Sequence, residues 1–296
     1  MQFVVFILVY PILWLISILP YRLFYLFSDF ICFFVYRVIG YRKGTVRENL
    51  LIAFPEKTAE ERLAIERKFY QHMCDLFLEI IKTLTISEEE MNNRFTISNL
   101  EVLKEMESKG KSIALMTGHY ASYEWSVSVN KKLSVKGYAI YKKIANRHFD
   151  KLVRDIRTKF GATLITTKET ILTIETNYNA GVQSLYGFAS DQSPKASRAI
   201  NWGTFFGIET PLQTGAEMLA KKFDMNVMFM RIRKVKRGYY DCSFEVLSYD
   251  AKSVPDFELT HLFMRKMEEQ ILEAPEYYLW THKRWKHRRA LETGLS

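Results

Sequence analysis

Short apolar runs alternate with helix-like segments along the middle of the chain. The apolar runs are predicted strands at residues 112–117, 136–141, 162–166 and 182–189. The segments between them predict helices at residues 120–132, 147–160 and 168–179. Strands that alternate with helices are typical of an α/β domain with a largely parallel central sheet flanked by helices. The pattern therefore predicts this fold class for the main part of the chain.

Further elements are predicted on both sides of this region. Thr58 with Glu61 has the pattern of a capping box, and the helix that it opens carries apolar residues at helical spacing. Ser98 with Glu101 predicts the start of another helix. Residues 225–232 and 239–247 predict a hairpin, and residues 257–273 predict a helix. The sequence shows no internal repeat and no linker, which favours one folded domain.

The N-terminus is a long apolar segment. Residues 3–20 carry no charge, and residues 23–39 carry only Asp29 and Arg37. The first run is near the lower length limit for a bilayer span, and it lacks the flanks of a signal peptide. The basic residues that follow place the rest of the chain in the cytoplasm by the positive-inside rule. We expect a membrane anchor and apolar interfacial segment at 1–40 and a cytoplasmic domain at 41–296. Whether the run spans the bilayer or lies in its interface stays open, and a buried core helix is the alternative.

Composition narrows the range of partners. The formal net charge is +9, which favours anionic partners such as phospholipid surfaces. The basic residues are dispersed and form no recognised reader motif, so we predict no nucleic-acid partner. Cys32, Cys74 and Cys242 are far apart, and the histidines form no ligand-spaced cluster. We therefore predict no metal site and no cofactor.

Polar side chains that suit catalysis follow the predicted strands. His119 follows the strand at 112–117, and Asp191 with Gln192 follows the strand at 182–189. Tyr141 is the last residue of the strand at 136–141, and Lys142 follows it. Chemistry in open α/β sheets collects at the carboxyl ends of strands. His119 is also the first residue of an H-x-x-x-x-E pattern with Glu124. The two side chains can meet if His119 lies on the loop and Glu124 begins the next helix. A histidine backed by a carboxylate can take a proton from a hydroxyl group.

Several blocks in order along the chain carry a family resemblance. They are Leu19-Pro20, the block from Tyr41 to Pro55, the H-x-x-x-x-E pattern, Tyr141 with Asn146 and Arg157, Asp191-Gln192, Gly215 with Leu219-Ala220, and the block from Pro275 to Lys286. With these blocks the chain resembles the lipid A late (secondary) acyltransferases, within the lysophospholipid acyltransferase superfamily. The resemblance covers nearly the whole length and implies a glycerolipid-acyltransferase-like fold.

The resemblance implies roles for particular residues. It implies that His119 and Glu124 form the catalytic pair, with Glu124 orienting the imidazole ring, and that Asp191 is a further catalytic residue. It also implies an arginine that stabilises charge, for which we choose Arg157, with Arg154 one turn earlier as the competitor. The substrate-binding positions that it implies are Tyr141, Lys142, Asn146, Arg154 and Gln192.

The resemblance also implies an activity and a location. The expected reaction is O-acyl transfer of a lauroyl- or myristoyl-type chain from acyl-acyl carrier protein to a hydroxyl of a lipid A precursor. The expected location is the cytoplasmic face of the cell inner membrane, in contact with its phospholipids. After Asp191-Gln192 the family continues with an acidic residue, a tyrosine and a glycine, whereas here Ser193-Pro194-Lys195 follows. This departure leaves the acceptor open, with a lysophospholipid, a glycolipid or an aminolipid as alternatives.

Two interpretations of the remaining features stay open. A non-catalytic membrane-associated protein that recruits partners through its basic surface is the alternative from a different functional class. It requires His119 and Glu124 to be dispensable. Residues 277–289 mix aromatic and basic side chains. This mixture suits either a membrane interface or packing against the domain.

Overall fold

A seven-stranded sheet lies at the centre of the structure, a computed structural model that describes residues 2–289. The strand order is β1-β9-β8-β2-β5-β3-β4. The strands are β1 (Phe95–Ile97), β2 (Ile113–Thr117), β3 (Lys136–Tyr141), β4 (Thr163–Thr166), β5 (Ser184–Ala189), β8 (Asn226–Lys236) and β9 (Tyr239–Ser248). A separate antiparallel pair is formed by β6 (Trp202–Phe205) and β7 (Ile208–Pro211).

The predicted α/β fold class is confirmed. Strands β8, β2, β5, β3 and β4 run parallel to one another. The predicted hairpin is formed by β8 and β9, and it reverses the chain direction, so that β1, which pairs parallel to β9, also runs opposite to β2. The sheet is therefore largely parallel, with its two reversed strands at one edge.

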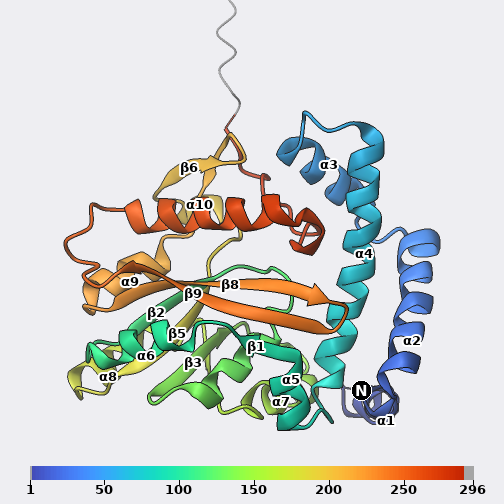
Figure 1. Cartoon of the computed structure of the whole chain (residues 1–296), viewed down its shortest axis with the longest axis horizontal. Coiled ribbons are helices and arrows are strands. Elements are labelled where there is room, and N and C mark those ends of the chain that lie inside the picture. The colour runs from blue at the N-terminus through green and yellow to red at the C-terminus, as the bar shows by residue number, and fades with distance from the viewer. Residues whose placement is uncertain (1, 290–296) are drawn as a thin grey trace, which may run out of the picture.

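Helices surround the sheet (Figure 1). Their bounds are α1 (Gln2–Ile18), α2 (Tyr21–Phe33), η1 (Phe34–Ile39), α3 (Lys43–Ala53), α4 (Ala59–Lys82), α5 (Glu88–Arg94), α6 (Leu100–Ser108), η2 (Trp125–Lys132), α7 (Arg147–Thr158), α8 (Thr170–Asn179), η3 (Ala196–Arg198), α9 (Gly215–Lys222), α10 (Glu258–Glu273) and η4 (Pro275–Tyr277). Figure 1 shows α10 along the upper side of the sheet. The long helix α4 stands upright at the end toward which β8 points, with α2 on its outer side.

Two predicted helix starts differ from the structure. The helix predicted at 120–132 is reduced to the 3-10 helix η2, because Tyr120 pairs with Tyr278 in a β-bridge and Ala121 has φ of 47°. A non-glycine residue in this left-handed region interrupts a right-handed helix. Ser98 does not cap α6, since its hydroxyl donates to the carbonyl of Cys242 and Asn99 occupies the N-cap position.

Helix α4 is the main support at this end of the sheet. The predicted capping box is present, because Thr58 and Glu61 exchange backbone–side-chain hydrogen bonds. Apolar residues such as Phe69 and Met73 are buried in the core, as the helical spacing predicts. The same helix also buries Asp75 and Glu79, and buried carboxylates require partners.

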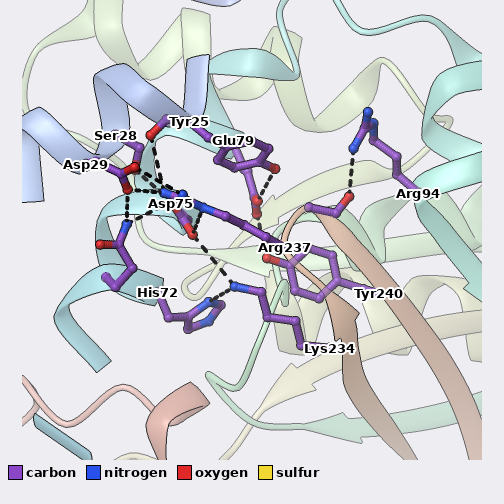
Figure 2. Close-up of polar contacts among 12 residues, drawn as sticks. Tyr25, Ser28, Asp29, His72, Asp75, Glu79, Arg94, Lys234, Arg237 and Tyr240 are labelled. Carbon is purple, nitrogen blue, oxygen red and sulfur yellow. Dashed lines mark hydrogen bonds and ion pairs between the residues drawn. The ribbon is translucent and has the colours of Figure 1, made fainter. Parts of the chain in front are cut away.

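A buried polar network supplies those partners and joins three elements (Figure 2). Asp75 accepts hydrogen bonds from Ser28 of α2 at 2.7 Å and from the Arg237 Nη2 atom of the β8–β9 turn at 2.7 Å. Glu79 accepts from Tyr25 of α2 and from Tyr240 of β9, each at 2.8 Å. The network therefore holds α2 against α4 and the hairpin.

The N-terminal segment expected as an anchor forms α1 and α2. Both helices expose apolar side chains, among them Leu8 on α1 and Leu26 and Phe30 on α2. Among residues 2–289, no single helix is both long and apolar enough to cross a membrane. Only the pair Tyr21–Ile39 and Lys43–Ala53 together has that length and composition, with a bend of 92° between its members. The division of the chain at residue 40 stays a prediction, and residues 290–296 of the expected domain lie outside the described part.

Candidate active site

Two neighbouring strands bring a histidine and an aspartate together. In the parallel pairing of β2 with β5, the last residues Thr117 and Ala189 are register partners. The backbone N–H of Ser190 continues the ladder by donating to the carbonyl of Thr117 at 3.0 Å. His119 and Asp191 each follow two residues after their strands, so they arrive at the same point of the carboxyl edge. The Nδ1 atom of His119 lies 2.7 Å from the Oδ1 atom of Asp191.

This His119–Asp191 pair is electrostatically coupled. Burial lowers the pKa of His119, but the charge and hydrogen bond of Asp191 outweigh burial, so that the pKa is raised above its usual value. Burial raises the pKa of Asp191, but the charge and hydrogen bonds of His119 lower it by more, so that the pKa lies below its usual value. Asp191 is therefore a carboxylate at neutral pH. When the imidazole of His119 is neutral, its Nδ1–H donates a hydrogen bond to Asp191. The other ring nitrogen, Nε2, is then the one that can take a proton.

Glu124 has a different partner. Its two carboxylate oxygens accept hydrogen bonds from Nε and Nη2 of Arg157, at 2.9 and 2.6 Å. Burial lowers the pKa of Arg157, but Glu124 raises it by more, so that the pKa lies above its usual value. The guanidinium is therefore a fixed positive charge. The orienting contact that the sequence assigned to Glu124 is thus made by Asp191. Glu124 still lies close enough to His119 for its charge to raise the pKa of the ring.

The other predicted substrate-binding residues lie around α7. Arg154 donates to the hydroxyl of Tyr141 at 3.2 Å and does not line the cavity beside His119, whereas Arg157 lines it and pairs with Glu124. Asn146 caps α7, because its side chain accepts from the backbone N–H of His148 at 3.0 Å. Lys142 is exposed beside the site.

Two residues remain to be placed beside His119. Gln192 follows Asp191 and is half-buried. The sequence did not single out Tyr123, whose ring packs edge-on against His119 with the ring centroids 4.9 Å apart. Its place within the H-x-x-x-x-E pattern, directly before Glu124, is the only sequence signal for this tyrosine.

The C-terminal segment supports the loop that carries His119. The backbone N–H of Leu279 donates to the carbonyl of His119 at 3.1 Å, and that of Ala121 donates to the carbonyl of Tyr277 at 2.9 Å. Together with the bridge from Tyr120 to Tyr278, these bonds fix the loop on both sides of the histidine. Tyr278 is buried, as are Trp280 and Trp285 farther along the segment. Packing against the domain, and not a membrane interface, therefore explains these three aromatics.

The same segment also reaches the Asp191 loop. Burial lowers the pKa of the His282 ring to about 4, so the ring is neutral. Its Nε2 atom accepts a hydrogen bond from the backbone N–H of Ser193 at 3.2 Å. Arg284 is buried, and its charge attracts Asp191. The sequence missed this support because the contacts join residues about ninety positions apart.

A cavity of about 520 Å³ extends from His119 along the sheet. His119, Glu124 and Arg157 line it where the strands end. The rest of its wall is mostly apolar and comes from β2, β3, β4, β5, η2 and α4, including Phe77, Leu115, Val127, Leu133, Ile140, Leu164 and Leu185. From Ala189 back to Leu185 the lining of β5 covers about 13 Å, the length of about ten methylene groups in an extended chain. Such a space suits a hydrocarbon chain whose reacting end lies near His119.

No group of three or more metal-ligating side chains occurs within residues 2–289. The arrangement places a histidine at the polar end of an apolar cavity, and an enzyme that acts on a long acyl chain requires such a geometry.

Comparison with known proteins identifies the family. The sequence model described as bacterial lipid A biosynthesis acyltransferase matches residues 1–287, and the chain belongs to this family. It is 22% identical over 296 residues to the lipid A biosynthesis palmitoleoyltransferase of Escherichia coli (strain K12), covering 96% of this chain and 92% of that protein. It is 22% identical over 282 residues to the lipid A biosynthesis lauroyltransferase of the same organism, covering 94% and 90%. The names of these relatives specify different acyl chains, so similarity to them does not determine the length of the acyl chain that this protein transfers.

Proposed function

We propose that this lipid A acyltransferase moves a fatty acyl chain from acyl-acyl carrier protein to a hydroxyl of a lipid A precursor, with His119 as the general base. The observation that carries the proposal is the His119–Asp191 pair at the polar end of the apolar cavity. The cavity supplies a place for the acyl chain of the donor. The pair supplies a nitrogen that can remove the proton of the acceptor hydroxyl.

The proposed reaction is a direct transfer. Nε2 of His119 takes the proton from the acceptor hydroxyl while the hydroxyl oxygen attacks the carbonyl carbon of the thioester. The tetrahedral intermediate then expels the thiolate of the carrier, which receives the proton from the imidazolium. Asp191 holds the ring in one tautomer and stabilises the imidazolium while it exists, as the carboxylate does in a hydrolase triad.

Arg157 is proposed to stabilise the oxyanion. It lines the cavity beside His119, and its pairing with Glu124 holds the guanidinium in one orientation. A preorganised donor of this kind is typically worth about 3 kcal/mol in the transition state. Glu124 is therefore proposed to position Arg157 and to add negative charge near the imidazolium.

The donor and the membrane are proposed partners. Lys142 and Lys143 are exposed next to the cavity, and an acidic carrier protein suits such a basic rim. The exposed apolar side chains of α1, α2 and η1 suit attachment to the inner-membrane surface. The cytoplasmic location of the catalytic domain rests on the charge rule of the flanking sequence.

The test is an assay of the purified protein with acyl-acyl carrier protein and a tetra-acylated lipid A precursor, read by mass spectrometry. We expect the wild type to add one acyl chain to the precursor and His119→Ala to add none. His148→Ala is the matched control, because His148 lies half-buried on α7 and does not line the cavity. His119→Ala with near wild-type turnover, or a wild type that leaves the precursor unchanged, would overturn the proposal.

A further inference from the structure

A second hollow, distinct from the cavity beside His119, lies next to the C-terminal segment. Its volume is about 410 Å³, and it lies between α3 and the turns that follow His282. Its lining differs from the acyl cavity in being mainly polar. The lining residues are Glu48, Asn49, Lys283, Trp285, Lys286 and Arg288.

The hollow is positively charged. It is lined by three cations, Lys283, Lys286 and Arg288, and by one carboxylate, Glu48, which leaves a net charge of +2. Arg288 is paired with Glu48 at 3.2 Å. Within the described part of the chain, no carboxylate lies within ion-pair distance of Lys283 or Lys286. The two lysines therefore remain to attract an anion from solution.

The floor of the hollow is rigid. Asn49 is 3% exposed, and its Nδ2 atom donates to the carbonyls of Trp280 and His282, both at 2.7 Å. Trp285 is 1% exposed, and its indole N–H donates to the carbonyl of Phe205 at 3.3 Å. Because the floor beneath the two unpaired lysines is already fixed, it does not have to be ordered when an anion binds.

The hollow adjoins the catalytic loop. Lys283 directly follows His282, whose ring accepts a hydrogen bond from the backbone of Ser193. Ser193 lies two residues after Asp191, the partner of His119. Residues 279–282 thus contact the loop of His119, through Leu279, and the floor of the hollow, through the carbonyls of Trp280 and His282. An acceptor would have to extend across this segment to have its anionic group in the hollow and its hydroxyl near His119.

We propose that the basic hollow binds a phosphate monoester on the sugar of the acceptor lipid. This inference rests on the proposed function, because it assigns the bound phosphate to the lipid A precursor that we propose as the acceptor. Lysine ammonium groups bind phosphate as point charges. The hollow is concave and lined by six side chains, which suits a compact phosphate group better than the convex helix of a carrier protein.

The kinetic test compares two acceptors in the same detergent micelles, the phosphorylated precursor and its enzymatically dephosphorylated form. For Lys283→Ala/Lys286→Ala we expect the KM of the phosphorylated acceptor to rise roughly tenfold or more, with kcat little changed. The KM of the dephosphorylated acceptor stays at its wild-type value. The control is Lys136→Ala/Lys252→Ala, which removes two exposed lysines, one at the start of β3 and one in the turn after β9. Equal changes for both acceptors, as expected of a patch that binds only the lipid surface, would overturn the inference.

A binding test is independent of acyl transfer. Glucosamine 1-phosphate is titrated with protein and followed by the broadening of its phosphorus NMR signal, with inorganic phosphate as competitor. We expect saturable broadening with the wild type and with Lys283→Arg/Lys286→Arg, and its loss in the double alanine variant. The same broadening in the double alanine variant contradicts the site. Failure of the acyl-transfer assay with intact phosphate binding would instead reject the proposed function and keep the hollow as an anion site.

Discussion

Two acidic side chains near His119 have different partners, and the roles that we propose for them follow from this difference. Asp191 is 1% exposed and contacts the ring nitrogen, so it fixes the tautomer of His119. Glu124 is bound to Arg157 through two hydrogen bonds, so it fixes the position of a positive charge. The imidazolium that forms during proton transfer lies near both carboxylates, and the charges of both raise the pKa of His119.

Arg157→Lys tests the proposed oxyanion role at the level of one side chain. Lysine keeps the positive charge but cannot form the two parallel hydrogen bonds to Glu124. We expect the rate of acyl transfer to fall about a hundredfold, corresponding to about 2.7 kcal/mol. The measurement is single-turnover kinetics with saturating donor. Arg154→Lys is the control, since Arg154 contacts Tyr141 and does not line the cavity. Equal effects of the two substitutions would contradict the assignment.

The sequence predicted which residues reach the carboxyl edge but not which of them meet. His119 and Asp191 were placed by the strand pattern, because both follow apolar runs. Their contact depends on the adjacent positions of β2 and β5 in the sheet and on the register that pairs Thr117 with Ala189. Nothing local encodes that register. Glu124 looked like the partner of His119 because it is close in sequence.

At the level of secondary structure, β5 shapes the apolar cavity beside His119. Gly187 lies in the middle of this strand, between Leu115 of β2 and Ala139 of β3 in the register. A Cβ atom built at Gly187 has only the carbonyl oxygen of Tyr138 within 4 Å, at 3.6 Å. Because Gly187 also lines the cavity, a side chain at this position has room to extend into the space that we assign to the acyl chain.

Gly187→Leu is therefore predicted to shorten the accepted acyl chain. The new side chain fills the middle of the cavity, about 7 Å from Ala189, and blocks the inner part, which is about 6 Å long. The variant should therefore prefer donors about five carbons shorter than the wild type does. Competition among acyl-acyl carrier proteins of different lengths, with products weighed by mass spectrometry, measures the preference. Gly44→Leu is the control, because Gly44 lies on α3 with nothing within 4 Å of its Cβ position. An unchanged chain-length preference in Gly187→Leu would exclude this cavity as the acyl site.

The polar network around α4 predicts a stability effect. Asp75→Asn removes the carboxylate that faces Arg237 and Lys234, and it leaves the Lys234 ammonium buried with less compensation. We expect a loss of about 3 kcal/mol in the free energy of unfolding, from urea denaturation in detergent. Asp155→Asn, at an exposed pair with Lys151, should change the free energy by less than about 1 kcal/mol. A loss for Asp75→Asn as small as that of the control would show that the network does not hold α2 in place.

Elements with regular apolar spacing were predictable, and those fixed by distant contacts were not. Strands β2 to β5 and β8 carry short apolar runs, and β9 alternates polar with apolar residues, so their positions were predicted within a few residues. Strand β1 has three residues and is held by its pairing with β9, and β6 and β7 have four residues each. Residues 1–40 were predicted as a membrane anchor and an apolar interfacial segment. In the structure Pro20 separates α1 from α2, and Ser28 of α2 donates a hydrogen bond to Asp75 of α4.

At the scale of the whole molecule, α1, α2 and η1 present exposed apolar side chains on one part of the surface. Leu26 and Phe30 of α2 are 65% and 57% exposed, while Ser28 of the same helix is buried against Asp75. An amphipathic helix with its polar side bound to the protein suits attachment to a bilayer surface. Figure 1 places α2 at the outer edge of the molecule, beyond α4.

Leu26→Gln/Phe30→Gln is expected to weaken membrane attachment. Loss of two large apolar side chains from the interface should reduce the fraction that sediments with anionic phospholipid vesicles roughly tenfold or more. Ile171→Gln/Leu172→Gln is the matched control, because these residues are 54% and 67% exposed on α8, away from α2. Equal sedimentation of the two double variants would contradict attachment through α2.

The central claim is that His119, held by Asp191, removes the proton of the acceptor. The most direct measurement is the single-turnover rate of acyl transfer as a function of pH for the wild type and Asp191→Asn. The base must be unprotonated, so the wild-type rate should rise with pH through a midpoint above 6.5, the ordinary pKa of histidine, because Asp191 raises the pKa of His119. In Asp191→Asn that charge is lost and burial lowers the pKa. The midpoint should therefore move to lower pH, and the plateau rate should fall about a hundredfold or more. An unchanged midpoint in Asp191→Asn would contradict the account.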